Sequence, residues 1–153
     1  MSHDCRVTGT LSIKHGVTEN QIKNALKNFL REHSLDFDEE QAEGNIEIEG
    51  RALFLSLDIQ GDGGYRNESL DALSDSLDEI VDIYGYLEFL DFDTGSSDAA
   101  CTPYFIGADE AARTSARVMY GISQMEPWIL PVIGVDAFET ITKEILSQPL
   151  AGQ

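Results

Sequence analysis

Apolar and polar residues alternate along two segments of this chain, which predicts β-strands, and two further segments rich in aromatic or apolar residues are strand-like. The segments are "CRVTGTLSIK" (residues 5–14), "NIEIEGRALFLSLDI" (45–59), "YGYLEFLDFD" (84–93) and "CTPYFIG" (101–107). In the first segment, Val7, Leu11 and Ile13 fall on one face of the strand. The second segment is long enough for two strands with a turn near Gly50, so it predicts a hairpin. We therefore expect five strands.

Four other segments have apolar residues at spacings of three and four, which predicts amphipathic α-helices. These segments are residues 17–33, 70–82, 109–123 and 136–147. Thr18 and Gln21 match a capping box at the start of the first helix. Asn67 or Ser69 is the expected N-cap of the second helix, and Asp109 that of the third.

Each predicted helix has an apolar stripe that we expect to face the core. The stripe of the second helix consists of Leu70, Leu73, Leu77, Ile80 and Val81. The last helix has Asp136 and Glu139 in capping-box positions, and its expected inward residues are Phe138, Ile141, Ile145 and Leu146. Residues 61–64, "GDGG", predict a flexible loop.

The order of these elements predicts an α+β fold with a single domain over residues 1–153. The first six elements follow the order βαββαβ, which matches a ferredoxin-like core with an antiparallel sheet and helices on one face. A further strand and two C-terminal helices come after that core. The ferredoxin-like fold supports many unrelated functions, so function must be argued from a site.

Negative charge is concentrated in one part of the chain, which has a net charge of −18. Residues 1–35 contain five basic and three acidic residues, a net of +2, whereas residues 36–153 contain five basic and twenty-five acidic residues, a net of −20. Twelve acidic residues and no Lys or Arg lie between Arg66 and Arg113. Such charge argues against nucleic acid or an anionic membrane as a direct partner and favours a basic protein.

A row of like charges stands out in "DALSDSLDEIVD", residues 71–82. Asp71, Asp75, Asp78 and Asp82 follow one another at steps of four, three and four, with Glu79 beside them. On a helix this spacing forms a line next to the apolar stripe. Each close pair costs roughly 0.2–0.5 kcal/mol, so a row that destabilises the fold indicates a role in binding.

The row alone is too sparse to imitate nucleic acid, with one carboxylate per about 5.5 Å against one phosphate per about 3.4 Å along a DNA strand. We therefore expect neighbouring acids to complete a partner-binding surface. The expected additions are Asp36, Asp38, Glu39 and Glu40 in "DFDEE", and Glu88, Asp91 and Asp93. The alternative is an acidic face that is merely solvated.

These features favour a non-enzymatic acidic inhibitor whose carboxylates occupy the phosphate-binding sites of a basic nucleic-acid-handling protein or nucleoprotein complex. In size and charge the chain is similar to phage and plasmid anti-defence proteins, including anti-CRISPR and anti-restriction proteins, and to immunity proteins that neutralise toxins. Lys23, Lys27 and Arg31 could pair with the protein's own acids or with those of a second copy, so homodimerisation is a further alternative.

A second hypothesis is an enzyme or small-ligand-binding domain with a pocket near residues 84–105. Its aromatic walls would be Tyr84, Tyr86, Phe92, Tyr104 and Phe105, with Asp91 or Asp93 as the polar contact. No sequence motif supports catalysis, a metal or a cofactor. The loop that begins at Asp58 resembles the start of a calcium loop, but its twelfth position is Ser69 where a calcium loop has Glu. Cys5 and Cys101 are expected to be reduced thiols in a cytoplasmic protein without a membrane span.

Overall fold

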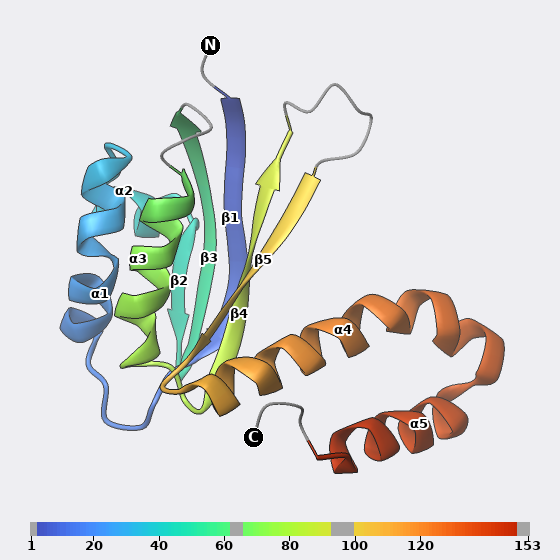
Figure 1. The fold of residues 1–153 in the computed structure, drawn as a ribbon. Helices are drawn as coiled ribbons and strands as arrows, with labels where there is room; N and C mark the ends of the chain where they lie inside the picture. Colours follow the sequence, from blue (N-terminus) through green and yellow to red (C-terminus); the bar gives the residue numbers. More distant parts are fainter. Residues whose placement is uncertain (1–2, 62–65, 93–99, 150–153) are drawn as a thin grey trace.

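The computed structural model describes residues 3–61, 66–92 and 100–149, which form an α+β fold around one antiparallel sheet (Figure 1). Its strands are β1 (His3–Ser12), β2 (Ile46–Glu49), β3 (Ala52–Gly61), β4 (Tyr84–Asp91) and β5 (Ala100–Gly107). Its helices are α1 (Glu19–Glu32), α2 (Phe37–Ala42), α3 (Arg66–Asp78), α4 (Glu110–Ile133) and α5 (Val135–Ser147). The strands agree with the sequence-based expectation, whereas the predicted loop beyond Gly61 lies outside the described residues.

The strand order is β2-β3-β1-β4-β5, so the first strand of the chain lies in the middle of the sheet. β1 pairs antiparallel with both of its neighbours, with Val7 opposite Leu57 of β3 and Phe89 of β4. These three side chains are buried, as the alternating pattern requires of residues on one face of a sheet. β2 and β5 form the two edges.

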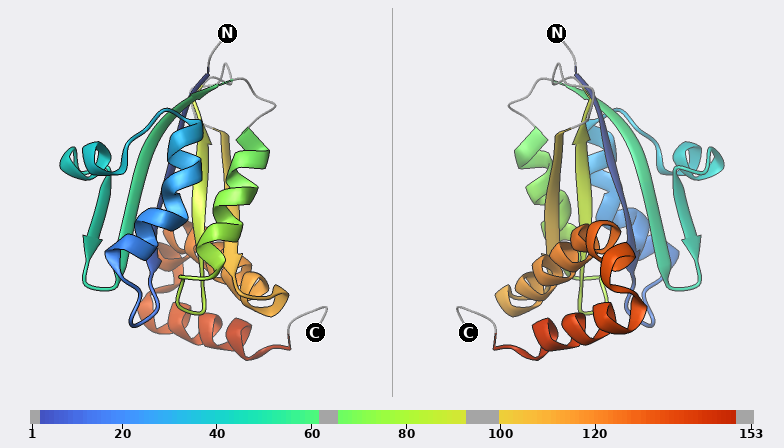
Figure 2. Two further views of the ribbon diagram at one scale, coloured as in Figure 1. Left: turned by 90° about the vertical axis from the view of Figure 1, so that its left-hand side faces the viewer. Right: turned by 90° about the vertical axis from the view of Figure 1, so that its right-hand side faces the viewer.

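Two helices, α1 and α3, cover one face of this sheet, and α4 passes across the other face at β4 and β5 (Figure 2). The apolar stripe expected of α3 is buried as predicted. The predicted capping box of α1 is also confirmed, because the Thr18 hydroxyl accepts from the Gln21 N–H at 3.2 Å and the Gln21 side chain accepts from the Thr18 N–H at 2.8 Å. The main core therefore lies between the α1–α3 layer and the sheet.

The bounds of α3 differ from the prediction at both ends. The helix begins at Arg66, so neither Asn67 nor Ser69 is its N-cap. Ser69 lies within the helix and is buried, and its hydroxyl is 3.2 Å from Nε2 of His33, the residue that follows α1. The helix ends at Asp78, and Asp82 therefore lies beyond it.

One helix, α2, was not predicted, because "DFDEE" reads only as a cluster of charge. Asp36 is its N-cap, with Oδ2 accepting from the N–H of Glu39 at 3.1 Å. Phe37 is buried and fastens this short helix to the core, since a helix of six residues is not stable in isolation.

The two C-terminal helices also depart from the prediction. α4 continues ten residues past Ser123, through Pro127 and Pro131, although a proline inside a helix costs about 3 kcal/mol. α5 begins after Gly134 and has no side-chain cap, so the predicted capping box at Asp136 is wrong. Of the four apolar residues expected to face inward on α5, Phe138 is buried and Ile145 half-buried, whereas the prediction is wrong for Ile141 and Leu146, which are exposed. No helix in the described part of the chain has the length and apolar character needed to cross a bilayer.

Candidate partner-binding surface

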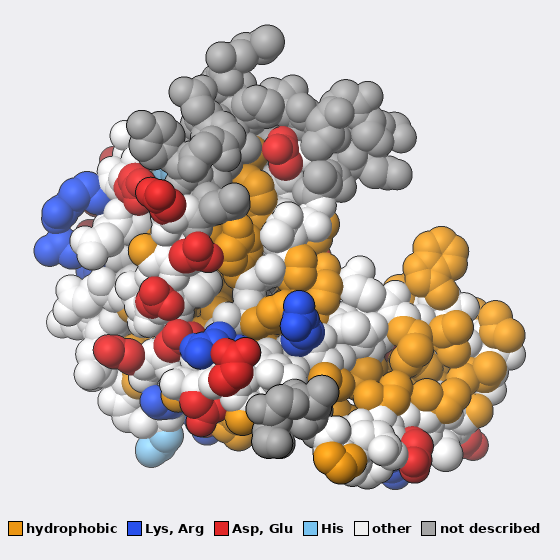
Figure 3. Space-filling model, viewed as in Figure 1, with side chains coloured by type: hydrophobic (Ala, Val, Ile, Leu, Met, Phe, Trp, Pro, Cys, Tyr) orange, Lys and Arg blue, Asp and Glu red, His pale blue; other side chains and the backbone are white. Residues whose placement is uncertain are grey.

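The outer side of α3 carries a line of exposed carboxylates (Figure 3). Glu68, Asp71 and Asp75 on α3 and Glu79, the first residue after it, are all exposed and follow one another at steps of three, four and four, and we call these four residues the acidic ridge. The residues between them on the inner side, such as Leu73 and Leu77, are buried and hold the helix against the sheet. The helical period therefore separates a core face from a charged outer face.

The four carboxylates of the acidic ridge form no ion pair within the part of the chain that the structure describes. Over eleven residues at about 1.5 Å each, the ridge extends roughly 16 Å. Because these groups are solvated in the free protein, a cationic partner can approach them without first breaking an internal ion pair.

Asp78, which the sequence places in the same row, is used within the fold instead. Its Oδ1 accepts from the N–H of Gly107 at 2.8 Å, and its Oδ2 lies 3.5 Å from Nη1 of Arg113. Burial raises the pKa of the Asp78 carboxyl, although the Gly107 hydrogen bond and the Arg113 charge act in the opposite direction. Asp78 therefore joins the end of α3 to the end of β5 and to α4.

Asp82 also lies outside the acidic ridge. It follows the end of α3, and its Oδ2 is 2.7 Å from Nη2 of Arg51 in an ion pair on the surface. Nε of Arg51 also donates to the carbonyl of Ile13 at 2.9 Å. The prediction that Asp82 continues a helical row is wrong, because the chain leaves the helix four residues earlier.

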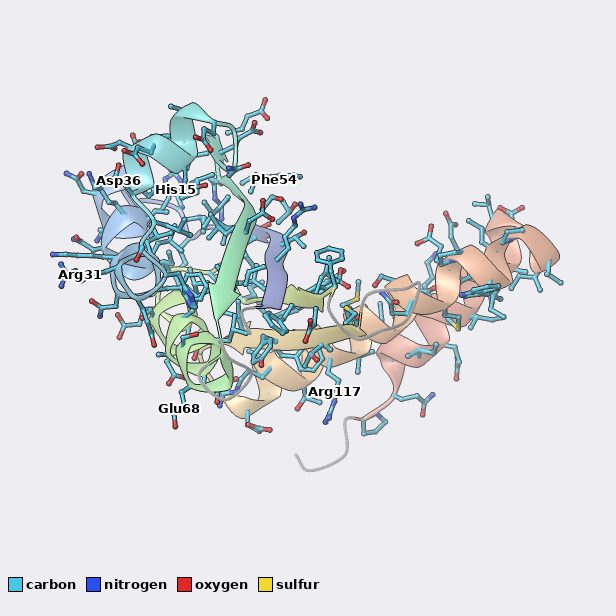
Figure 4. The ribbon with its side chains drawn as sticks, turned by 90° about the horizontal axis from the view of Figure 1, so that it is seen from above. His15, Arg31, Asp36, Phe54, Glu68 and Arg117 are labelled. Atoms are coloured by element: carbon cyan, nitrogen blue, oxygen red, sulfur yellow. The ribbon has the colours of Figure 1, made fainter. Side chains whose placement is uncertain are left out.

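The acids of residues 36–40 lie on the far side of α1 from the ridge (Figure 4). Asp36 caps α2, Asp38 lies 3.5 Å from Lys23, and Glu40 accepts from Asn45 at 2.9 Å. Glu39 is exposed. Because the basic side chains of α1, including Arg31, lie between these acids and the ridge, the two groups do not form one continuous acidic surface.

Of the predicted acids on and after β4, Glu88 is separated from the ridge. Glu88 points to the opposite face of the sheet, where Oε2 accepts from Sγ of Cys101 at 3.0 Å and lies 3.4 Å from the Tyr120 hydroxyl on α4. Asp91, at the end of β4, is half-buried and lies opposite Cys5 in the strand register. Asp93 falls outside the described residues.

A groove of about 430 Å³ borders the acidic ridge on the side of α4. Asp71 and Asp75 form one wall, Tyr104 its floor on β5, and Arg113 and Arg117 the other wall on α4. Burial and the nearby Asp71 carboxylate raise the pKa of Tyr104. Arg113 forms an ion pair with Asp78, so Arg117 is the cation that most reduces the negative potential of this groove.

Sequence reasoning missed this basic border. Arg113 and Arg117 are four residues apart on α4, a spacing that places both on one side of a helix. Nothing in the local pattern indicates that this side faces α3, because that contact depends on how α4 crosses the sheet. Gly107 permits the crossing, since an added Cβ there would lie 2.6 Å from the Cβ of Ala112.

The five aromatic residues predicted to surround a ligand lie in several settings in the described part of the chain. Tyr120 of α4 fills the space between Tyr86 and Phe105, with ring centroids 5.0 Å and 6.0 Å away. Tyr84 borders a separate hollow with Gly9, and Phe92 lies 5.6 Å from the guanidinium of Arg6. Tyr104 and Phe105 both line the groove beside α3, and Tyr84 and Tyr86 both border the hollow with Gly9.

Cys101 lies beside these aromatic residues and is exposed. Partial burial of the thiol and its hydrogen bond to Glu88 raise the pKa of Cys101, which disfavours the thiolate needed for nucleophilic attack. Among the described residues, no three His, Cys, Asp or Glu side chains are grouped so as to bind a metal ion.

Comparison of the chain with protein-family models, curated proteins and solved structures finds no match. The candidate site therefore rests on the geometry and charge of the acidic ridge itself.

Proposed function

We propose that this protein is a non-enzymatic inhibitor that binds a basic, nucleic-acid-handling protein through the acidic ridge of α3. The observation that carries the proposal is the alignment of four exposed carboxylates that have no ion pair within the described chain. Their mutual repulsion destabilises the free protein and is relieved when cationic side chains or a phosphate-binding groove approach.

The ridge is presented by a rigid support. We infer that β1, α1, β2, β3, α3 and β4 form a ferredoxin-like unit, with β5 added at the β4 edge. The inference is supported by the position of β1 between β3 and β4, antiparallel to both, and by the packing of α1 and α3 on the same face. A helix fixed in this way displays its charges without an ordering cost on binding.

The partner is a phosphate-binding protein of a defence system or a nuclease toxin, and we propose a cytoplasmic location because both cysteines are free thiols. An anti-CRISPR or anti-restriction protein and a toxin-neutralising immunity protein would use the ridge in the same way. They differ in which nuclease they block, so a panel of nucleases distinguishes them.

The test adds the purified protein to DNA-cleavage assays with guide-loaded CRISPR effectors, restriction endonucleases and nuclease toxins. One class is expected to be inhibited, with a potency that falls as salt rises from about 0.05 to 0.5 M because charge pairing is screened. Inhibition restricted to nuclease toxins would assign the protein as an immunity protein.

Two variants of equal charge make the test specific. Asp71→Lys with Asp75→Lys reverses the centre of the ridge, whereas Glu47→Lys with Glu49→Lys reverses two exposed acids of the distant edge strand β2. We expect the ridge variant to lose at least about tenfold in potency, equivalent to about 1.4 kcal/mol, and the control to retain inhibition. Equal potency of the two variants, or no inhibition across the panel, would contradict the proposal.

A further inference from the structure

The C-terminal part of the molecule is a helical hairpin that leaves the α/β body (Figures 1 and 2). The first half of α4 is anchored to the sheet through Ala116 and Ile122, which are buried. Beyond Ile122, α4 continues away from the sheet, and after Gly134 α5 turns back along it. We call residues 124–147 the α4–α5 hairpin.

The hairpin has almost no core of its own. Among residues 124–147 of the described chain, Phe138 is the one buried side chain. A helix of thirteen residues such as α5 is marginal alone in water, and its stability normally comes from packing of an apolar face. The hairpin also contains Pro127 and Pro131, which weaken the helix further.

Large apolar side chains of the hairpin face solvent instead of packing within it (Figure 3). Their exposed fractions are Trp128 79%, Val132 81%, Val135 61%, Leu146 51%, Ile141 41% and Ile133 37%. Together they expose on the order of 500 Å² of apolar surface, taking roughly 200 Å² for the tryptophan and about 60 Å² for each aliphatic side chain. A patch of this size on one element marks an interaction site.

We propose that the α4–α5 hairpin is a self-association surface, through which two copies of this chain pack about a two-fold axis to form a four-helix bundle. The area supports a second copy as the occupant. A homodimer interface of standard size buries about 800 Å² per copy and is about 65% apolar, or roughly 500 Å². In a two-fold arrangement the same patch serves both partners, so each copy must supply that amount.

The charge distribution supports the same occupant. Two chains that each carry −18 repel one another over most of their surfaces. Residues 118–135 contain one charged side chain, Glu126, whereas the rest of α5 adds Asp136, Glu139, Lys143 and Glu144, so two copies meet with least repulsion along the α4 part of the hairpin. An uncharged patch offers a cationic partner no ion pair, and a membrane with anionic lipids would repel the rest of the molecule.

The inference is independent of the proposed function, because none of the hairpin residues belongs to the acidic ridge. A dimer of this kind would leave both ridges on the outer faces of their own α/β bodies. The ridge variant Asp71→Lys with Asp75→Lys is therefore expected to dimerise like the original chain, even where it loses inhibition.

Sedimentation equilibrium in 0.5 M NaCl tests the proposal directly. The original chain is expected to have twice its 16.9 kDa mass at about 50 μM, because salt at this level screens the repulsion between copies. Trp128→Glu with Val132→Glu should halve that mass. The matched control Phe54→Glu with Ile83→Glu, which alters two exposed apolar residues outside the hairpin, should remain a dimer.

Fluorescence provides a second measurement on the unaltered chain, because Trp128 is the only tryptophan of the sequence. Its emission should shift to shorter wavelength as protein concentration rises and return on dilution. A monomer at all concentrations, a dimer that survives the Trp128 and Val132 changes, or an open series of larger oligomers would overturn the proposal. So would an emission shift that needs phosphatidylcholine vesicles and is independent of protein concentration.

Discussion

The carboxylate of Asp78 accepts a hydrogen bond from the backbone N–H of Gly107, with 2.8 Å between Oδ1 and N. Gly107 is buried, so Asp78→Ala would leave this N–H without its acceptor and should cost about 1–3 kcal/mol of unfolding free energy. Asp78→Asn keeps an acceptor oxygen and should cost less. Urea unfolding of the three proteins checks the order, and equal losses in both variants would contradict it.

Asp78 should also make the stability of the folded protein depend on pH, and its raised pKa fixes the direction of that dependence. Burial raises its pKa in the folded protein, so the folded state binds the proton more tightly than the unfolded state. The stability that Asp78 contributes relative to Asp78→Asn should be greatest below its unfolded pKa, about 3.9, and should fall as pH rises through the folded-state pKa. Urea unfolding of both proteins between pH 3 and 7 measures the difference; a difference that grows with pH would exclude this account.

The acidic ridge should make the free protein less stable than it could be. Asp75→Lys converts the like-charge pairs with Asp71 and Glu79 into opposite-charge pairs. Each repulsion removed and each attraction formed contributes roughly 0.2–0.5 kcal/mol, so the free energy of unfolding should rise by about 1 kcal/mol. Urea unfolding at low salt should show the gain, and 0.5 M NaCl should reduce it. Glu49→Lys on β2 is the control and should change stability little. Destabilisation by Asp75→Lys would show that this carboxylate has a structural role.

Adjacent residues on β3 should differ sharply in their sensitivity to truncation. Leu53 is fully buried against the α1–α3 layer, whereas Phe54 points to the other face and is 51% exposed. Leu53→Ala should cost about 2–5 kcal/mol because it leaves a cavity, and Phe54→Ala less than about 1 kcal/mol. Thermal or urea unfolding measures both changes. Similar losses would indicate that the far face of the sheet is covered, as it would be by an additional partner.

The thiol of Cys101 should react slowly at neutral pH. Its raised pKa predicts that alkylation by iodoacetamide has a midpoint above the usual thiol value of about 8.5, while buried Cys5 stays unreactive. Glu88→Gln removes the neighbouring negative charge, lowers the pKa of Cys101 and should increase the rate at pH 7 severalfold. Glu47→Gln is the distant control. A midpoint below 8.5 in the original chain would revive a nucleophilic role for Cys101.

Thr18→Ala tests the capping box of α1, which both the sequence and the structure assign. Loss of the hydroxyl that accepts from Gln21 N–H should cost about 1 kcal/mol, within a usual range of 0.5–2 kcal/mol. Asn20→Ala in the same turn has no such bond in the described structure and should be neutral or slightly stabilising. Equal effects of the two changes in urea unfolding would mean that the capping box contributes nothing.

The sequence by itself determined the elements whose information is local. The two-residue alternation located β1, β2 and β3, and the spacing of Leu70, Leu73 and Leu77 identified the buried side of α3. The capping box at Thr18 was also readable, because its two hydrogen bonds join residues three positions apart. Short-range periodicity is sufficient for such features, since one residue's neighbours along the chain decide them.

The tertiary structure alone decided which acids remain available. The sequence placed Asp75, Asp78 and Asp82 in one row, but Asp78 is bound to Gly107 and Asp82 to Arg51. Those partners are far away in sequence and become neighbours when β5 pairs with β4 beside α3 and when β3 pairs with β1. Likewise, the apolar spacing of Ile141 and Leu146 indicates a face to be covered, yet it cannot specify the covering surface. Charge and hydrophobicity are encoded residue by residue, whereas neutralisation and burial depend on where the chain brings distant segments together.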